Sequence, residues 1–225
     1  MNPKDTEWKE KWEQIYENEL LGYTKRTTDK AYPIGKNEPG FFVKFLYPIY
    51  KITNNDIVLE IGCGQGNWIH NLYDKVKEIY GTDISESAIN RAKYFFREEK
   101  KVFLYAETEL TKIFEPKKFD VIYSITVFQH LPKRQTLQYF KDAYALLKDS
   151  GIFFFNVFAK CSVGDFDVNI NDLDIYHHHT TVSFTQEELE KNLIETGFKN
   201  IDIEFMKVEH SDPNYGWLIG RIRKC

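Results

Sequence analysis

The chain has 225 residues and a formal net charge of −4. This length suits one α/β domain with a substantial core and is too short for two independent domains. The acidic balance gives no global electrostatic case for binding nucleic acid. Three cysteines and the absence of an apolar run of membrane-spanning length favour a soluble protein of the reducing cytoplasm, without a membrane partner.

The first 54 residues are predicted to form a helical extension that can serve as a lid. Residues 5–20 carry aromatic and aliphatic side chains at helical spacing with charges between them, which predicts an amphipathic helix. Residues 21–39 are predicted as irregular, and residues 41–50 as a second helix. Tyr23 and Tyr32 lie in the irregular part, so we expect them to contact a substrate.

From residue 55 to residue 225, strand and helix patterns alternate as in a single catalytic core. We expect strands at 57–61, 77–82, 102–106, 119–125, 151–158, 200–206 and 215–222, and helices at 67–74, 85–98, 134–148 and 185–196. This alternation predicts an α/β fold with a mostly parallel seven-stranded sheet and helices on both faces. The last two strands have no helix between them and should form an antiparallel hairpin.

The first predicted strand ends in Glu60-Ile61-Gly62-Cys63-Gly64-Gln65-Gly66, where three glycines stand at alternate positions. Glycines there let the backbone turn sharply and approach a ligand closely. The second strand ends at Asp83, where α/β nucleotide sites bind ribose hydroxyls. A dinucleotide fingerprint needs its third glycine one residue later, where Asn67 stands. Cys63 is interpreted as a small packing residue, with a reactive thiol as the alternative.

These residues resemble the first motif of the class I S-adenosylmethionine-dependent methyltransferases. Residues 119–132, from Phe119-Asp120 to His130-Leu131-Pro132, are similar to the fourth-strand motif of the small-molecule members. The resemblance covers about residues 55–222 and implies a Rossmann-like fold and S-adenosylmethionine as cofactor. The cofactor-binding residues that it implies are Glu60, Gly62, Cys63, Gly64, Gly66, Asp83, Ile84, Glu107, Thr108 and Ser124.

The acceptor is expected at the carboxyl end of the fourth strand. His130 is interpreted either as a catalytic base or substrate-binding group, or as a residue that fixes its own loop. The long insertion 159–184 is a candidate lid. Its histidines could supply a base, bind a metal or be solvated, and no metal site is predicted. The predicted catalytic residues are His130, His177, His178 and His179, and the predicted substrate-binding residues also include Val127, Phe128, Gln129 and Tyr176.

The function predicted from these features is O-methylation of a small hydroxylated acceptor, such as a sugar or a sugar-linked metabolite. A polar, histidine-rich insertion, the missing Asn/Asp-Pro-Pro-aromatic tetrad and the acidic net charge favour it. The alternatives are N- or carboxyl-methylation of a small metabolite and a protein that binds S-adenosylmethionine without catalysis. RNA methylation is disfavoured, and the N-terminal helix could also form a homodimer contact.

Overall fold

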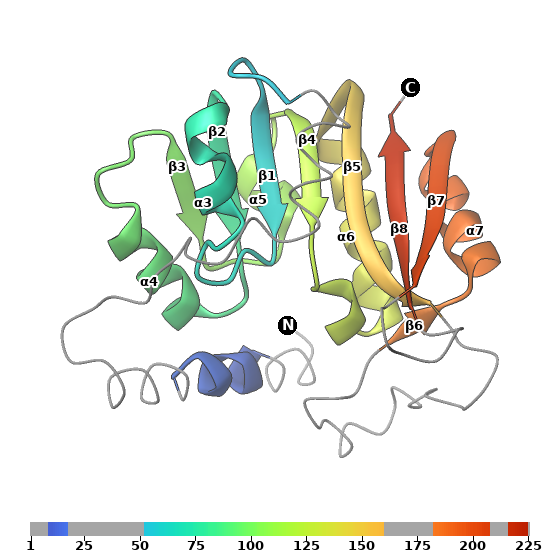
Figure 1. Ribbon diagram of the computed structural model, residues 1–225, viewed down its shortest axis with the longest axis horizontal. Helices are drawn as coiled ribbons and strands as arrows, with labels where there is room; N and C mark the ends of the chain where they lie inside the picture. Colours follow the sequence, from blue (N-terminus) through green and yellow to red (C-terminus); the bar gives the residue numbers. More distant parts are fainter. Residues whose placement is uncertain (1–8, 18–51, 160–181, 208–215, 225) are drawn as a thin grey trace. The chain divides into compact units, whose positions relative to one another are not determined.

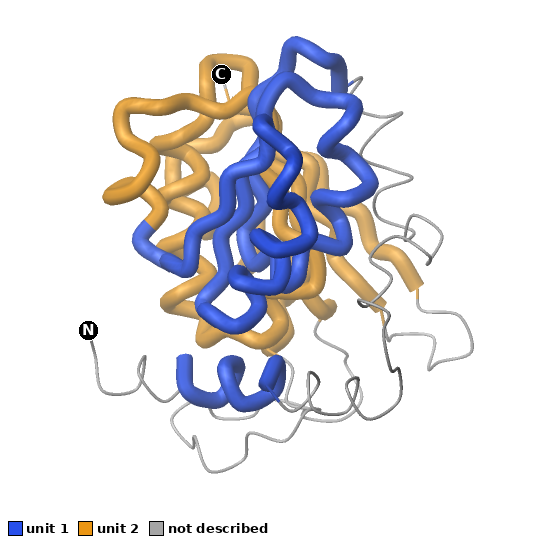
Figure 2. The backbone as a smooth tube through the Cα atoms, turned by 90° about the vertical axis from the view of Figure 1, so that its left-hand side faces the viewer, with its two compact units in different colours: residues 1–109 blue, residues 110–225 orange. Residues whose placement is uncertain are grey.

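The computed structural model describes residues 9–17, 52–159, 182–207 and 216–224. The predicted helix 41–50 and the predicted site residues Tyr23, Tyr32, Tyr176 and His177–His179 lie outside these ranges. The chain divides into two compact units, residues 1–109 and 110–225 (Figure 2).

The first unit is built on three parallel strands in the order β3-β2-β1 (Figure 1). β1 spans Ile57–Ile61, β2 spans Glu78–Thr82 and β3 spans Val102–Tyr105. The apolar side chains of β1 and β2 are almost all buried, as expected of strands covered on both faces. Because the strands run parallel, β1 and β2 deliver the residues after them to the same edge of the sheet.

Helices connect these strands. α3 (Ile69–Leu72) continues into a 3₁₀ turn, η1 (Tyr73–Lys75), and α4 spans Glu86–Phe95. A further helix covers residues 9–17, within the predicted 5–20. The predicted helix 67–74 is thus two short pieces, and the predicted helix 85–98 ends at Phe95 because the following residues form turns.

The second unit contains β4 (Phe119–Ser124), β5 (Leu147–Ala159), β6 (Ser183–Phe184), β7 (Asn200–Lys207) and β8 (Gly216–Arg223). β4 pairs parallel with β5, and β8 lies antiparallel between β5 and β7. The predicted antiparallel hairpin is therefore confirmed. The two-residue β6, which pairs with β5, was not predicted.

The helices of this unit are α5 (Leu110–Phe114), the 3₁₀ turn η2 (Phe128–His130), α6 (Lys133–Leu146) and α7 (Gln186–Thr196). α5 was not predicted because its five residues are too few to show a helical period. Phe128, Phe140, Phe153 and Phe155 are fully buried, and the rings of Phe140 and Phe155 lie 4.9 Å apart. Much of the high aromatic content therefore serves the core.

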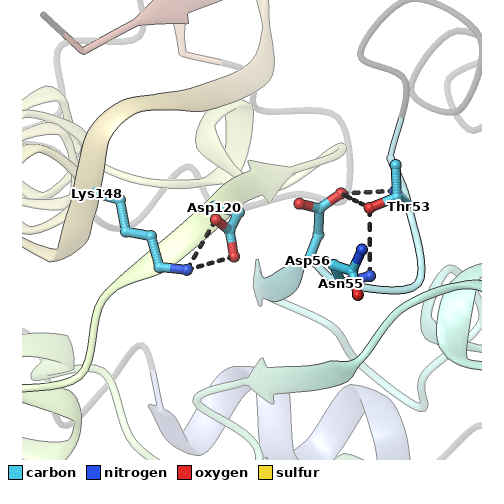
Figure 3. A network of polar contacts seen from close by, with 5 residues as sticks. All are labelled: Thr53, Asn55, Asp56, Asp120 and Lys148. Atoms are coloured by element: carbon cyan, nitrogen blue, oxygen red, sulfur yellow. Dashed lines mark hydrogen bonds and ion pairs between the residues drawn. The ribbon is translucent and has the colours of Figure 1, made fainter.

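Polar contacts fix the beginnings of strands in each unit (Figure 3). Asp56 accepts hydrogen bonds from the Thr53 backbone amide at 2.6 Å and the Thr53 hydroxyl at 3.1 Å, in the turn before β1. In the second unit, Lys148 Nζ donates to both carboxylate oxygens of Asp120 at 2.8 Å. Among the described residues, no helix is long and apolar enough to cross a membrane.

Candidate active site

The glycine loop after β1 is held by the end of β2. Gly62, Gly64 and Gly66 have φ values of 72°, 52° and 87°, in the region that L side chains rarely adopt. The amides of Gly62 and Cys63 both donate to the carbonyl of Thr82, at 2.8 and 2.9 Å. These two amides are engaged within the protein, so a ligand carboxylate at this loop would need other donors.

Asp83 is the centre of this edge. Its Oδ2 accepts from the Gly64 amide at 2.8 Å, and its Oδ1 accepts from the Ser85 amide at 2.9 Å. Burial raises the pKa of the Asp83 carboxyl, while these hydrogen bonds oppose the rise. The Ile84 backbone also lowers this pKa, and because a carboxylate has about four lone-pair positions, acceptor capacity remains for a ligand. The structure thus brings Asp83 and the glycine loop together through the Gly64 amide.

Cys63 is a buried free cysteine whose environment suppresses its reactivity. Burial raises the pKa of its thiol well above the ordinary value, and the nearby charges of Glu60 and Asp83 raise it further. Because the thiolate is the nucleophilic form, this cysteine is a poor nucleophile at neutral pH. The structure favours the interpretation of Cys63 as a small packing residue.

The remaining predicted residues of the first unit follow β2 and β3. Ile84 is half-buried directly after Asp83. Glu107 is also half-buried, and its Oε1 accepts from the Thr108 amide at 2.8 Å. Glu107 thus has a structural part in the turn before Leu110, and its second oxygen could receive a ligand amino group.

Two residues of the helix 9–17 join this edge and were not predicted as site residues. Glu13 accepts hydrogen bonds from the first turn of α4, and the Tyr16 hydroxyl lies against Gly64. The helical period of this segment was visible in the sequence, but the partner of Glu13 was not, because a glutamate on a charged helix is usually solvated.

In the second unit, the turn after β4 is strained and supported from β5. Thr126 has φ 60°, an uncommon value for a β-branched residue. Its amide donates to Oδ1 of Asn156 at 2.8 Å, and Asn156 is fully buried. Backbone strain of this kind is often kept at functional sites. Ser124, predicted to bind the cofactor, is fully buried at the end of β4.

Gln129 and His130 follow in η2. The side-chain nitrogen of Gln129 lies 3.3 Å from Nε2 of His130. With the amide in this orientation, its nitrogen donates and Nε2 of His130 accepts. Burial lowers the pKa of His130 from 6.5 to about 4, so its ring is neutral at physiological pH.

The neighbouring predicted residues differ in exposure. Val127 is half-buried, but Phe128 is fully buried, with its ring 5.6 Å from that of Phe140. Phe128 therefore belongs to the core rather than to a substrate surface. The end of the insertion meets this turn, because the Val182 amide donates to the Gln129 carbonyl at 2.7 Å.

A family model described as a methyltransferase domain matches residues 35–203. The chain is 26% identical over 152 residues to phosphoethanolamine N-methyltransferase of Plasmodium falciparum, covering 67% of this chain and 56% of that protein. It is 29% identical over 155 residues to ubiquinone biosynthesis O-methyltransferase of Coxiella burnetii, covering 66% and 64%. The chain thus spans less than two thirds of the length of either relative.

Among solved structures, magnesium protoporphyrin IX methyltransferase of Synechocystis PCC 6803 with bound SAH aligns with a TM-score of 0.63. The sequences are 15% identical, and the alignment covers 96% of this chain and 99% of the other. At this identity the likeness concerns the fold, and it confirms the predicted Rossmann-like α/β class.

Proposed function

The chain belongs to the methyltransferase-domain family, and we propose that it transfers a methyl group from S-adenosylmethionine to a small-molecule acceptor. The observation that carries this proposal is the buried edge of the first unit. There the loop after β1 and the carboxylate after β2 are joined by the 2.8 Å hydrogen bond from the Gly64 amide to Asp83.

The residues at this edge fit the cofactor. Gly64 and Gly66 have positive φ values and no room for a side chain, because an added Cβ would lie 2.5 Å from the Tyr16 hydroxyl and 2.7 Å from the Phe96 ring, respectively. Asp83 keeps acceptor positions for ribose hydroxyls. The proposed binding set is Glu60, Gly62, Cys63, Gly64, Gly66, Asp83, Ile84, Glu107, Thr108 and Ser124. When bound, S-adenosylmethionine supplies an electrophilic methyl group on a sulfonium sulfur.

Isothermal titration with S-adenosylhomocysteine tests this assignment. Asp83→Asn keeps the size of the side chain but replaces one acceptor by a donor, so we expect the Kd to rise by about tenfold or more. Asp120→Asn is the matched control, because Asp120 pairs with Lys148 at the beginning of a strand. An absence of binding by the unmodified protein would overturn the proposal.

For the acceptor, we propose a hydroxyl group whose orientation depends on His130. The Gln129 side chain lies 3.3 Å from Nε2 of His130 and helps to hold the neutral ring in place beside the strained turn after β4. A pKa of about 4 also makes His130 a weak base. This favours a substrate-orienting role over proton removal. The proton would then pass to another group, for which His177, His178 and His179 stay predictions.

Labelled methyl transfer with the variant His130→Gln separates the two roles. Loss of an orienting hydrogen bond should lower kcat/KM by about ten- to hundredfold while the shape of its pH profile is kept. Loss of a pH-dependent limb would instead identify His130 as the base. Unchanged kcat/KM at all pH values would remove His130 from the site.

N-methylation is the second candidate, and the relative named phosphoethanolamine N-methyltransferase favours it. A panel of hydroxylated, amine and carboxylate acceptors with methyl-labelled S-adenosylmethionine distinguishes the candidates by the labelled product. A sugar acceptor and contacts from Tyr23, Tyr32, Val127, Gln129 and Tyr176 stay predictions. The single domain with residues 1–54 as its lid, a homodimer and a cytoplasmic location also stay predictions.

A further inference from the structure

The helix 9–17 is attached to the beginning of α4 through one carboxylate. Oε2 of Glu13 accepts from the Ser85 hydroxyl at 2.8 Å, and Oε1 accepts from the Ser87 amide at 2.9 Å and also from the Ser87 hydroxyl. More than 70 residues separate these partners in sequence. The contact therefore joins the N-terminal segment directly to the residues that follow Asp83.

The beginning of α4 is well suited to a carboxylate. The first amides of a helix have no partner within the helix, and the helix dipole favours negative charge there. Ser85 already caps Ala88 at 3.1 Å, and Glu13 takes the amide of Ser87. Burial raises the pKa of Glu13, but the hydrogen bonds from Ser87 and Ser85 outweigh it and leave the pKa below its ordinary value. The charged form of Glu13 is thus the one that binds.

A second contact lies one helical turn further on. Residues three apart on a helix share a face, so Tyr16 lies on the same side as Glu13. An ideal Cβ on Gly64 would be 2.5 Å from the Tyr16 hydroxyl and 3.5 Å from Cζ. The helix consequently contacts both halves of the edge, the glycine loop through Tyr16 and the segment after Asp83 through Glu13.

We propose that Glu13 is a positioning residue of the cofactor site, which holds the helix 9–17 and its Tyr16 against the glycine loop and thereby slows cofactor release. This inference rests on the proposed function. Glu13 lies outside the set of residues predicted to touch the cofactor, and its effect is indirect, through the position of Tyr16.

The test compares Glu13→Gln with Glu10→Gln in the full chain. Glu10 is an exposed glutamate of the same helix, so the control changes the same charge without the contacts to α4. The dissociation rate of S-adenosylhomocysteine is measured by displacement in a stopped-flow instrument, with tryptophan fluorescence as signal. Because hydrogen bonds to a charged group are strong, we expect Glu13→Gln to raise this rate about tenfold or more and Glu10→Gln to leave it unchanged.

Hydrogen exchange supplies a readout independent of activity. In the ligand-free Glu13→Gln protein, the amide of Ser87 should exchange faster, and the strands should stay as protected as in the unmodified protein. Should Glu13→Gln fold poorly, Ser87→Ala removes the hydroxyl donor from the other side and should also raise the dissociation rate.

The outcomes are separable. If the unmodified protein binds no S-adenosylhomocysteine, the proposed function fails. If it binds and both Glu13→Gln and Ser87→Ala release the ligand at the unmodified rate, the role of Glu13 is wrong while the cofactor site stands. An equal acceleration by Glu10→Gln would show a general charge effect and would also overturn it.

Discussion

The contact between Tyr16 and Gly64 predicts a specific energetic coupling between the helix 9–17 and the glycine loop. Gly64→Ala introduces a methyl group at φ 52°, which costs about 1–2 kcal/mol for an L residue in the left-handed region. The methyl group would also lie 2.5 Å from the Tyr16 hydroxyl, far inside van der Waals contact. Overpacking of this kind costs about 1–3 kcal/mol more.

The clash depends on one oxygen atom. Without the hydroxyl, the nearest Tyr16 atom is Cζ at 3.5 Å, an ordinary contact. Tyr16→Phe should therefore rescue the steric part of the Gly64→Ala defect and leave its backbone part. In a double-mutant cycle, we expect a favourable coupling of about 1–3 kcal/mol between the two substitutions.

The cycle is measured as the free energy of unfolding in urea and as the Kd for S-adenosylhomocysteine. Four proteins are compared: the unmodified chain, each single variant and the double variant. The steric defect should appear in the Kd if the helix shifts to accommodate the methyl group, and in the unfolding free energy if it stays. Additive effects on both quantities, within about 0.5 kcal/mol, would refute the contact.

Further predictions concern the second unit. Asn156→Leu removes the acceptor of the Thr126 amide, so we expect a loss of about 1–3 kcal/mol in unfolding free energy. Thr126→Gly should stabilise by up to about 1 kcal/mol, because glycine adopts φ 60° without strain, and destabilisation would contradict this account. Burial lowers the pKa of His130 from 6.5 to about 4, so the unfolded chain binds more protons between these values. Stability should be complete above pH 6.5 and fall towards pH 4 by up to about 1.4 kcal/mol per unit. His130→Asn should lose this part of the pH dependence, and identical urea titrations of the two proteins would disprove it.

The sequence was sufficient to predict those parts of the fold in which the local hydrophobic pattern determines the element that forms. The apolar runs that end at Ile61 and Thr82 are buried parallel strands, so their carboxyl ends bring Gly64 and Asp83 together at one edge. The same reasoning found the C-terminal hairpin, because no helical period separates β7 from β8. It missed α5 and β6, whose five and two residues are too short to show any period.

The residues that sequence could not find are those whose partners lie far along the chain. Asn156 lies within a buried apolar strand, and only the turn at Thr126 explains why a polar side chain is kept there. From the sequence alone, Glu13 would be predicted to be a solvated charge. The structure shows that it accepts a hydrogen bond from the beginning of α4. In both cases a polar group stabilises a loop at the end of a strand from another element. Local sequence motifs predict the candidate site residues, and hydrogen bonds from distant parts of the chain hold the loops that carry them in position. Substitutions of Asn156 and Glu13 should therefore impair the site although neither belongs to a recognisable motif.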